Sequence, residues 1–310
     1  MDGSIAQVVT GLELWQWQSE AKQKAIAGCI PPDEVDWLLQ EVANLDRLSL
    51  RLELFKTRSE IALTRSLAEL SDLWQRRVES HMPVQYLVGV TPWRNFRLTV
   101  SPAVLIPRPE TEEIIDLAVA AVADQNSSLQ TGLQTGLQTG HWVDLGTGSG
   151  AIILGLAEVF PQATLHAVDS SLEALTLAQT NAQQLAYCDR IQFYQGSWFE
   201  PLAHLKGQLS GMVSNPPYIP YSMIPDLQPE VSLHEPHSAL DGGEDGLDCI
   251  RHLVRTAPEY LISGGIWLIE LMAGQAETVT QLLQAQGCYR SIQIHRDLAG
   301  IDRFVLAYRV

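Results

Sequence analysis

The sequence predicts an α/β protein, in which helices wrap a parallel sheet that follows a small helical segment. From His141 onward, short apolar runs alternate with amphipathic segments, which is the rhythm of such a sheet. Before His81, apolar residues recur at helical spacing instead. With 310 residues, 46% of them hydrophobic, the chain has room for one large domain and one small domain.

The first segment, from about Leu12 to His81, is predicted to be all-helical. Val35, Leu38, Leu39 and Val42 follow the helical period, and a Pro-Pro-Asp turn at 31–33 precedes a capped helix start. No catalytic constellation is visible in this segment. We therefore interpret it as a module for packing or for docking a partner.

A hairpin linker is predicted between His81 and Pro109. Apolar residues from Tyr86 to Val100 alternate roughly as they do in strands, and Pro92, Pro102, Pro107 and Pro109 break any helix. A helix from Thr111 to about Ala123 should follow. The tetrapeptide LQTG then occurs three times in tandem at 129–140, which predicts a mobile polar surface loop.

The sheet is predicted from five apolar runs, and the helices between them from amphipathic segments. We expect helices at 149–160 and 172–186, and the last twenty residues fit two strands joined by a Gly-containing turn, an antiparallel closing pair. The strand runs are WVDL, ATLHAVD, IQFY, GMVSN and GIWLIEL.

Charge and cysteine content limit the classes of partner, metal site and cellular setting that we expect. The formal net charge is −16, and both parts of the chain are acidic when it is divided near residue 80, which disfavours a mechanism built on many phosphate contacts. The four cysteines have no CxxC or metal-ligand spacing and are expected to be buried thiols, with no metal site. No signal sequence or membrane-length apolar run is visible, so we expect a reducing, cytoplasmic setting.

The segment VDLGTGSGA at 143–151 reads as strand, loop and helix. Gly146, Gly148 and Gly150 let the backbone turn tightly and approach a ligand, and the helix that follows offers free N–H groups. Asp169 ends the next strand, where a carboxylate can accept both hydroxyls of a ribose. The loop therefore predicts a cofactor that contains adenosine.

Two alternatives stay open at this loop. Gly146, Gly148 and Ala151 also satisfy the GxGxxA fingerprint of nicotinamide dinucleotide sites, with Asp169 at about the expected spacing. Asp144, just before the loop, is as well suited to capping the turn as to contacting a ligand.

The motif Asn215-Pro216-Pro217-Tyr218 decides between these cofactors. Two prolines remove two backbone donors, leaving the Asn215 side-chain oxygen and the Pro216 carbonyl as acceptors beside the face of Tyr218. Such a surface suits a planar group with two N–H donors, which is a primary amide or a nucleobase amino group. Hydrogen bonds to both protons favour a more pyramidal nitrogen and point its lone pair at a sulfonium methyl group.

With their surroundings, these residues resemble the HemK/PrmC family of release-factor glutamine methyltransferases. The likeness extends over nearly the whole chain through seven segments: PVQYLVG at 83–89, LIPRPETEE at 105–113, VDLGTGSGAI at 143–152, AVDSSLEAL at 167–175, VSNPPYIP at 213–220, EPHSALDGGEDGLD at 235–248 and RDLAGIDR at 296–303. It implies methyl transfer from S-adenosyl-L-methionine, with S-adenosyl-L-homocysteine as product, to the glutamine of the Gly-Gly-Gln motif in class I peptide-chain release factors.

The resemblance also implies an architecture. A helical domain that docks the release factor is expected at 1–81, a β-hairpin linker at 82–109, and a seven-stranded, Rossmann-like class I methyltransferase domain at 110–310 whose last strand is antiparallel. The residues implied to contact the cofactor are Gly146, Thr147, Gly148, Ser149, Gly150, Asp169, Trp198 and Asn215. The residues implied to hold the target glutamine are Asn215, Pro216, Pro217 and Tyr218, of which Asn215, Pro216 and Tyr218 are the catalytic candidates.

Three positions need separate comment. Many relatives place an acid where this chain has Ser197, so an acidic contact to the adenine amino group is in doubt, and Met272 stands where a glycine is usual. Arg108 lies in the segment that the resemblance places near the active site. We expect it either to pair with Glu110 or the substrate backbone, or to be a solvated arginine.

Three other functions remain as alternatives. A ribosomal-protein glutamine methyltransferase shares NPPY, but the segment 106–111 favours release factors. An adenine methyltransferase of DNA or RNA is disfavoured by the acidic charge and by the lack of a basic recognition domain, so no direct nucleic-acid binding is expected. A nonenzymatic adaptor is disfavoured by the complete motif.

Overall fold

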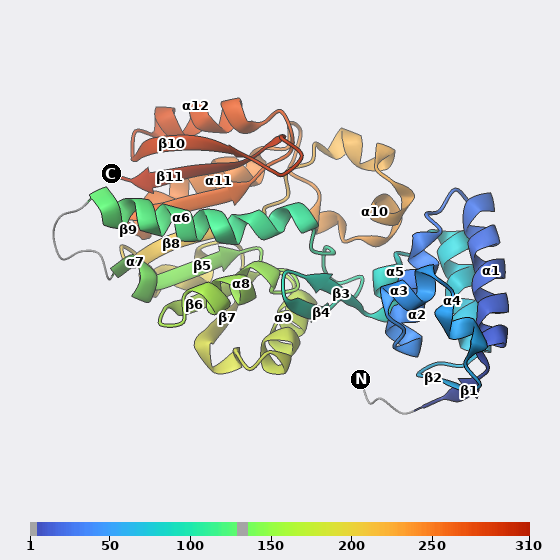
Figure 1. Cartoon of the computed structure of the whole chain (residues 1–310). Helices are drawn as coiled ribbons and strands as arrows, with labels where there is room; N and C mark the ends of the chain where they lie inside the picture. Colours follow the sequence, from blue (N-terminus) through green and yellow to red (C-terminus); the bar gives the residue numbers. More distant parts are fainter. Residues whose placement is uncertain (1–4, 129–135) are drawn as a thin grey trace. The chain divides into compact units, whose positions relative to one another are not determined.

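The computed structural model describes residues 5–128 and 136–310, and the chain divides into two compact units. The first unit comprises residues 1–89 together with Pro229–His234, and the second comprises Val90–Gln228 and Glu235–Val310. Figure 1 labels the elements of both units.

The first unit is built mainly from helices with well-made N-termini. Thr10 and Ser66 each form a capping box, with Glu13 and Glu69 respectively, which satisfies backbone N–H groups that a helix start otherwise leaves free. The helices are α1 (Gly11–Ala27), α2 (Asp33–Ala43), α3 (Arg47–Arg51), α4 (Leu67–Ser80), α5 (Val84–Val88) and α10 (Pro229–His234), with the 3-10 turn η1 (Leu54–Thr57).

The expectation of an all-helical first segment was wrong in one detail. Strand β1 (Gln7–Val9) pairs antiparallel with β2 (Ile61–Leu63), with Val9 opposite Ile61. Both strands are only three residues long, which is too short for periodicity to reveal them.

A buried arginine joins distant parts of this unit. The Arg77 side chain is 2% exposed, and its Nε lies 2.6 Å from Glu34 Oε2 while its Nη2 lies 2.7 Å from Glu230 Oε1. Glu230 belongs to α10, so two carboxylates on separate segments share one guanidinium. The pair of contacts holds α10 against α2 and α4.

The linker hairpin exists but begins later than the alternation suggested. Strand β3 (Val90–Trp93) pairs antiparallel with β4 (Phe96–Thr99). Tyr86 and Val88, which we expected in strands, belong to helix α5 instead. The Gly89 residue ends this helix with φ at 83°, a conformation that permits the abrupt change to a strand.

The second unit contains a seven-stranded sheet in the order β10-β11-β9-β8-β5-β6-β7. Strands β9, β8, β5, β6 and β7 are parallel to one another, and β11 is antiparallel to both β9 and β10. The expected parallel sheet with an antiparallel closing pair is confirmed. The strands are β5 (His141–Leu145), β6 (Thr164–Asp169), β7 (Ile191–Gln195), β8 (Leu209–Ser214), β9 (Leu261–Glu270), β10 (Tyr289–Arg296) and β11 (Asp302–Arg309).

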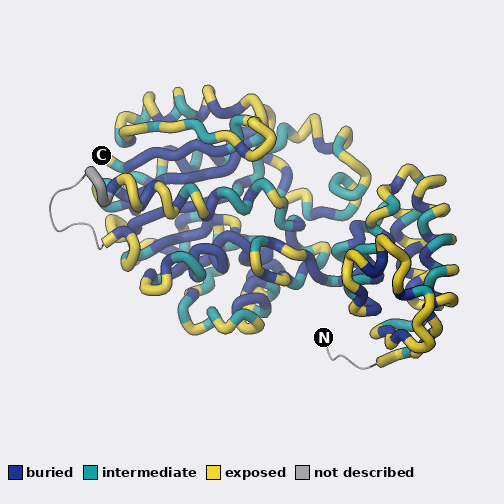
Figure 2. The backbone as a smooth tube through the Cα atoms, in the orientation of Figure 1, coloured by how far each residue is buried: buried dark blue, intermediate teal, exposed yellow. Residues whose placement is uncertain are grey.

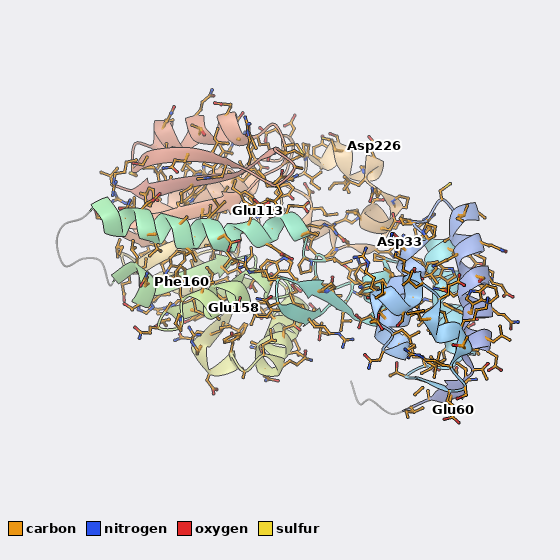
Figure 3. All side chains as sticks on the ribbon, viewed as in Figure 1. Asp33, Glu60, Glu113, Glu158, Phe160 and Asp226 are labelled. Carbon is orange, nitrogen blue, oxygen red and sulfur yellow. The ribbon has the colours of Figure 1, made fainter. Side chains whose placement is uncertain are left out.

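Helices cover both faces of this sheet, and its strands are the most deeply buried elements of the second unit (Figure 2). One core contains residues of α6 (Glu113–Ser128), α8 (Ala151–Val159) and α9 (Leu172–Gln184). The other contains residues of α11 (Asp248–Thr256) and α12 (Ala276–Gln286). In Figure 3, Glu113 marks the start of α6, and Glu158 and Phe160 mark the end of α8.

Part of the LQTG repeat is ordered, contrary to expectation. Residues 129–135 lie outside the described residues, but Gly136–Thr139 form the short helix α7. Leu137 is buried, and its carbonyl accepts a hydrogen bond from Trp142 Nε1 at 2.7 Å. The last repeat is therefore fixed to the start of β5 by a contact that its polar composition does not reveal.

The cysteines are less buried than expected. Cys29 is exposed, and Cys188, Cys249 and Cys288 are only partly buried. Within the described ranges, no helix is long and apolar enough to cross a membrane.

Candidate functional site

The site lies at the edge where four parallel strands end. Val213 of β8 lies opposite Asp144 of β5, and Leu145 lies opposite Val168 of β6. Because parallel strands end at a common edge, the segments that follow β5, β6, β8 and β9 are brought together there. These segments carry the glycine loop, Asp169, the NPPY motif and Glu270.

The glycine loop turns back onto the neighbouring strand. The backbone N–H groups of Gly146 and Thr147 both donate to the Val168 carbonyl, at 2.9 and 3.0 Å. Gly146 and Gly148 have φ values of 79° and 55°, which glycine adopts readily. A Cβ atom at Gly148 would meet no other atom within 4 Å, so this side of the loop faces open space.

Gly150 has a different role from the two glycines before it. It is the N-cap of α8 with φ at 85°, and a Cβ atom there would lie 3.2 Å from the Ala178 side chain. It is absent from the lining of the cavity described below. Gly150 thus permits close packing of α8 against α9.

Of the two roles considered for Asp144, capping the turn or contacting a ligand, the structure supports capping the turn. Its side chain is fully buried and accepts a hydrogen bond from Thr147 Oγ1 at 2.6 Å. Burial is the main reason that the pKa of Asp144 is raised from 3.8 to about 7; the hydrogen bond from Thr147 opposes this shift, and nearby Asp169 contributes to it. Asp144 is not among the residues that line the cavity.

Asp169 links the loop to the end of β6. Its two carboxylate oxygens accept hydrogen bonds from the backbone N–H groups of Gly148 and Ser171, each at 2.9 Å. Burial raises its pKa, and these backbone donors oppose the shift. A carboxylate has about four acceptor positions, so Asp169 can still accept a hydrogen bond from a ligand.

A cavity opens over these groups. Of the residues that the sequence singled out, Gly146, Thr147, Gly148, Ser149, Asp169, Trp198, Asn215 and Pro217 line it, whereas Gly150, Pro216 and Tyr218 do not. Trp198 has its ring 3.7 Å from the position of a Cβ atom at Gly146. An aromatic wall, a glycine loop without side chains and a carboxylate suit an adenosine-containing cofactor such as S-adenosylmethionine.

The NPPY motif leaves β8 as a rigid turn. Ser214 Oγ donates to the Leu145 carbonyl at 2.6 Å, which ties the end of β8 to the end of β5. Asn215 Nδ2 lies 3.4 Å from Thr111 Oγ1, and Pro216 is buried. The Tyr218 carbonyl accepts from Gln275 Nε2 at 2.9 Å, so both ends of the motif are held by other segments.

Glu270 is a site residue that the sequence analysis did not single out. It ends β9 with no exposed surface, and its Oε1 accepts from the Tyr218 hydroxyl at 3.2 Å. Burial raises the pKa of Glu270 to about 7, and burial also raises the pKa of Tyr218, which stays protonated. An ionisable residue that ends an apolar run at the carboxyl edge is the signal that would have found it.

Arg108 pairs with Glu235 and not with Glu110, so it is not a solvated arginine, and its contact with the substrate backbone stays a prediction. Its Nη2 lies 2.7 Å from Glu235 Oε2, and the Arg108 carbonyl accepts from Trp93 Nε1 at 3.1 Å. Glu235 is 127 residues away in sequence, which is why no local pattern pointed to it.

Known proteins resemble this chain over nearly its full length. The release factor glutamine methyltransferase of Synechocystis sp. is 55% identical to this chain over 299 residues, which cover 96% of this chain and 97% of that protein. The release factor glutamine methyltransferase of Thermosynechococcus vestitus is 47% identical over 298 residues, which cover 94% of this chain and 96% of that protein. The chain belongs to the release factor glutamine methyltransferase family. It is accordingly an S-adenosylmethionine-dependent protein-glutamine methyltransferase.

Two further comparisons concern the methyltransferase domain and its fold. The Methyltransferase small domain model matches residues 120–223, which include the glycine loop and NPPY. A crystal structure of the hMettl16 catalytic domain in complex with MAT2A 3'UTR hairpin 6 superimposes with a TM-score of 0.54 at 12% identity, covering 81% of this chain and 84% of that one. That likeness concerns the fold, a class I methyltransferase fold.

The departures from the family pattern are accommodated locally. Met272 is not among the described residues with a positive φ, so a side chain is tolerated there, and its N–H donates to Gln275 Oε1 at 3.1 Å. Ser197 lines the cavity and its N–H donates to Glu200 Oε2 at 3.3 Å.

Proposed function

We propose that this member of the family methylates the side-chain amide nitrogen of the glutamine in the Gly-Gly-Gln motif of class I peptide-chain release factors, and so modulates translation termination. The observation that carries the proposal is the NPPY turn at the rim of the cofactor cavity. Asn215 lines that cavity, and its amide nitrogen is turned to Thr111. Its side-chain oxygen is left to accept a proton of the substrate amide.

Orientation is the main contribution of these residues. When bound, S-adenosylmethionine supplies an electrophilic methyl group on a sulfonium sulfur. Asn215 Oδ1 and the Pro216 carbonyl accept the two N–H groups of the substrate amide, while Tyr218 packs against its plane. Fixing both protons directs the nitrogen lone pair and favours a pyramidal nitrogen, which the amide otherwise resists.

The cofactor residues divide into two groups. Gly146, Gly148, Asp169 and Trp198 are proposed to contact the cofactor directly, with Thr147, Ser149 and Asn215 completing the lining. Gly150 is proposed to act through the packing of α8, since its Cβ position faces Ala178.

The helical segment at 1–81 is proposed to dock the release factor. Three leucines that are close in sequence are at least 55% exposed, which is unusual for neighbouring apolar side chains. They are Leu48 in α3, Leu54 in η1 and Leu52 between these two elements. With a net charge of −16, the chain is proposed not to bind nucleic acid directly, and the family activity suits the cytoplasm, where release factors act.

One assay tests the proposal. Purified enzyme, labelled S-adenosylmethionine and a release factor are incubated, and the label is located by peptide mass spectrometry. We expect it on the glutamine of the Gly-Gly-Gln motif alone. Label found only on a ribosomal protein, or only on DNA or RNA, would overturn the proposed substrate. Changing Leu48 and Leu52 to serine should raise KM for the release factor without lowering kcat.

A further inference from the structure

The end of β9 brings a buried carboxyl group beside the NPPY turn. Ser214 lies opposite Ile269 in the parallel register of β8 and β9, so Asn215 and Glu270 are the next residues on the two strands. On its other side, Glu270 lies opposite Phe304 of β11. Its position is therefore determined by two strands of the sheet.

Glu270 is linked to both ends of the motif, directly to Tyr218 and through Thr111 to Asn215. The Tyr218 hydroxyl donates directly to Oε1 at 3.2 Å. The Thr111 side chain also hydrogen-bonds to the Glu270 carboxyl group, and Thr111 Oγ1 lies 3.4 Å from Asn215 Nδ2. A threonine hydroxyl donates one proton and accepts others, so Thr111 can relay between the Asn215 amide and the carboxyl group.

Folding alone gives little reason for an acid at this position. Within the part of the chain that the structure describes, Glu270 Oε2 has no hydrogen-bond partner. The charge of Arg303 favours the ionised form of Glu270, but the Arg303 Nε is 3.0 Å from Asp297 Oδ2, and the charge of Glu110 disfavours ionisation. A buried acid without a direct ion pair is costly, and an apolar side chain of similar size is commonly as stable.

We propose that Glu270 is a positioning residue for methyl transfer, which holds the Tyr218 ring directly and the Asn215 amide through Thr111 in the orientation that the substrate amide requires. The inference rests on the proposed function, because it assigns Glu270 to the geometry of that reaction. In the described part of the chain, the polar end of Tyr218 is held by its bond to Glu270 and that of Asn215 by its bond to Thr111. Loss of Glu270 should therefore release both groups together.

The kinetic test compares Glu270→Ala and Glu270→Gln with the unchanged enzyme. Glu270→Ala should lower kcat about 100-fold, the scale expected when a reacting group is misplaced by about 1 Å, with KM for the release factor and Kd for S-adenosylmethionine unchanged within about twofold. Glu270→Gln keeps an oxygen that accepts from Tyr218 and should recover most of the lost kcat. Glu259→Gln, which removes a surface acid paired with Lys206, is the control and should leave kcat unchanged.

A double variant separates positioning from general destabilisation. Because Glu270 acts partly through Tyr218, Tyr218→Phe should lower kcat, and Glu270→Ala added to it should lower kcat less than it does alone, by the part that acts through Asn215. Independent losses that multiply would overturn the proposal. So would an unchanged kcat in Glu270→Ala, or Glu270→Gln losing as much kcat as Glu270→Ala while both variants bind S-adenosylmethionine normally.

A crystal structure of Glu270→Ala provides a readout that does not depend on turnover. We expect the Tyr218 ring and the Asn215 side chain to be displaced or to adopt several orientations, whereas the glycine loop is unchanged. Both groups in their original positions would contradict the proposal. If Glu270→Ala does not fold, the same structural comparison is made with Glu270→Leu. Should the unchanged enzyme methylate no release factor, the proposed substrate fails, and this structural comparison still tests the role of Glu270.

Discussion

Arg108 and Glu235 form an ion pair at 2.7 Å, and only the arginine has appreciable contact with solvent: the Glu235 side chain is 1% exposed and that of Arg108 is 29% exposed. Burial raises the pKa of Glu235, and the neighbouring guanidinium opposes that shift. Pro107 and Pro236, the neighbours of these two residues, both line the cavity. The pair therefore joins two segments of the cavity wall that are distant in sequence.

Arg108→Ala should destabilise the protein by roughly 3 kcal/mol near pH 8, because it leaves a buried carboxylate without its cation. The loss should shrink as the pH is lowered, since an acid whose folded pKa is raised takes up a proton more readily in the folded state than in the unfolded state. Urea unfolding measures both effects. Arg108→Ala combined with Glu235→Gln removes the charge as well and should recover most of the stability. Equal instability of the single and double variants would show that the ion pair is not the cause.

Asp169→Ala should weaken the binding of S-adenosylmethionine by roughly 1.5–3 kcal/mol, the range for a hydrogen bond to a charged group. The substitution also removes the acceptor for the Gly148 and Ser171 N–H groups, so the loop loses support as well as the ligand contact. Titration calorimetry with the cofactor gives the affinity. Glu158 is an acid at the end of α8 that does not line the cavity. The variant Glu158→Ala has the same change of charge and should bind S-adenosylmethionine normally. Unchanged affinity in Asp169→Ala would remove this residue from the cofactor site.

Asn215→Ala should lose far more turnover than affinity for the release factor, because the contact matters chiefly in the transition state while the protein interface is broad. Asn215→Asp keeps an acceptor but loses the N–H group that faces Thr111, so partial activity is expected. Single-turnover rates and binding affinities are measured for both variants. An affinity loss that accounts for the whole loss of activity in Asn215→Ala would show that orientation is not its role.

A release factor whose target glutamine is replaced by asparagine should not be methylated. The side chain is shorter by one methylene group, so its amide cannot reach Asn215 Oδ1 and the Pro216 carbonyl together, and the site acts by orientation. Mass spectrometry after prolonged incubation detects any product. Binding of the altered release factor is the control and should be nearly normal, and efficient methylation of the asparagine would contradict the proposed geometry.

Asp144 should make the stability of the protein depend on pH. Its pKa is raised from 3.8 to about 7 in the folded protein, so between these values the folded state binds more protons than the unfolded state. The contribution of Asp144 to the free energy of unfolding is therefore present at low pH and is lost as the pH rises from 3.8 to about 7. The Asp144→Asn side chain cannot ionise, so in urea unfolding the stability of this variant relative to the unchanged protein should improve from pH 5 to about pH 7 and then level off towards pH 8. A constant difference over this range would mean that Asp144 does not titrate there.

The carboxyl-edge arrangement was predictable because it follows from local patterns. Apolar runs of strand length alternating with amphipathic helices specify a parallel sheet, and parallel strands bring the segments after them to a common edge. The glycine loop, Asp169 and the NPPY motif each stand at the end of such a run or directly after it. Their shared location, and the adenosine-containing cofactor that they indicate, therefore needed no tertiary information.

Contacts between distant segments were decided only by the tertiary structure. The β1–β2 pair, the Trp142 bond to Leu137, the Arg108–Glu235 pair and the link from Glu270 to Tyr218 join residues whose spacing has no period. The two roles open to Asp144 were equally compatible with its place in the sequence, and only its complete burial beneath Thr147 decided between them. Sequence alone determined which residue types stand at the ends of the strands. Packing determined which of them are buried, which share a hydrogen bond and which line the cavity, because burial and hydrogen bonding depend on neighbours that are close only in the folded chain.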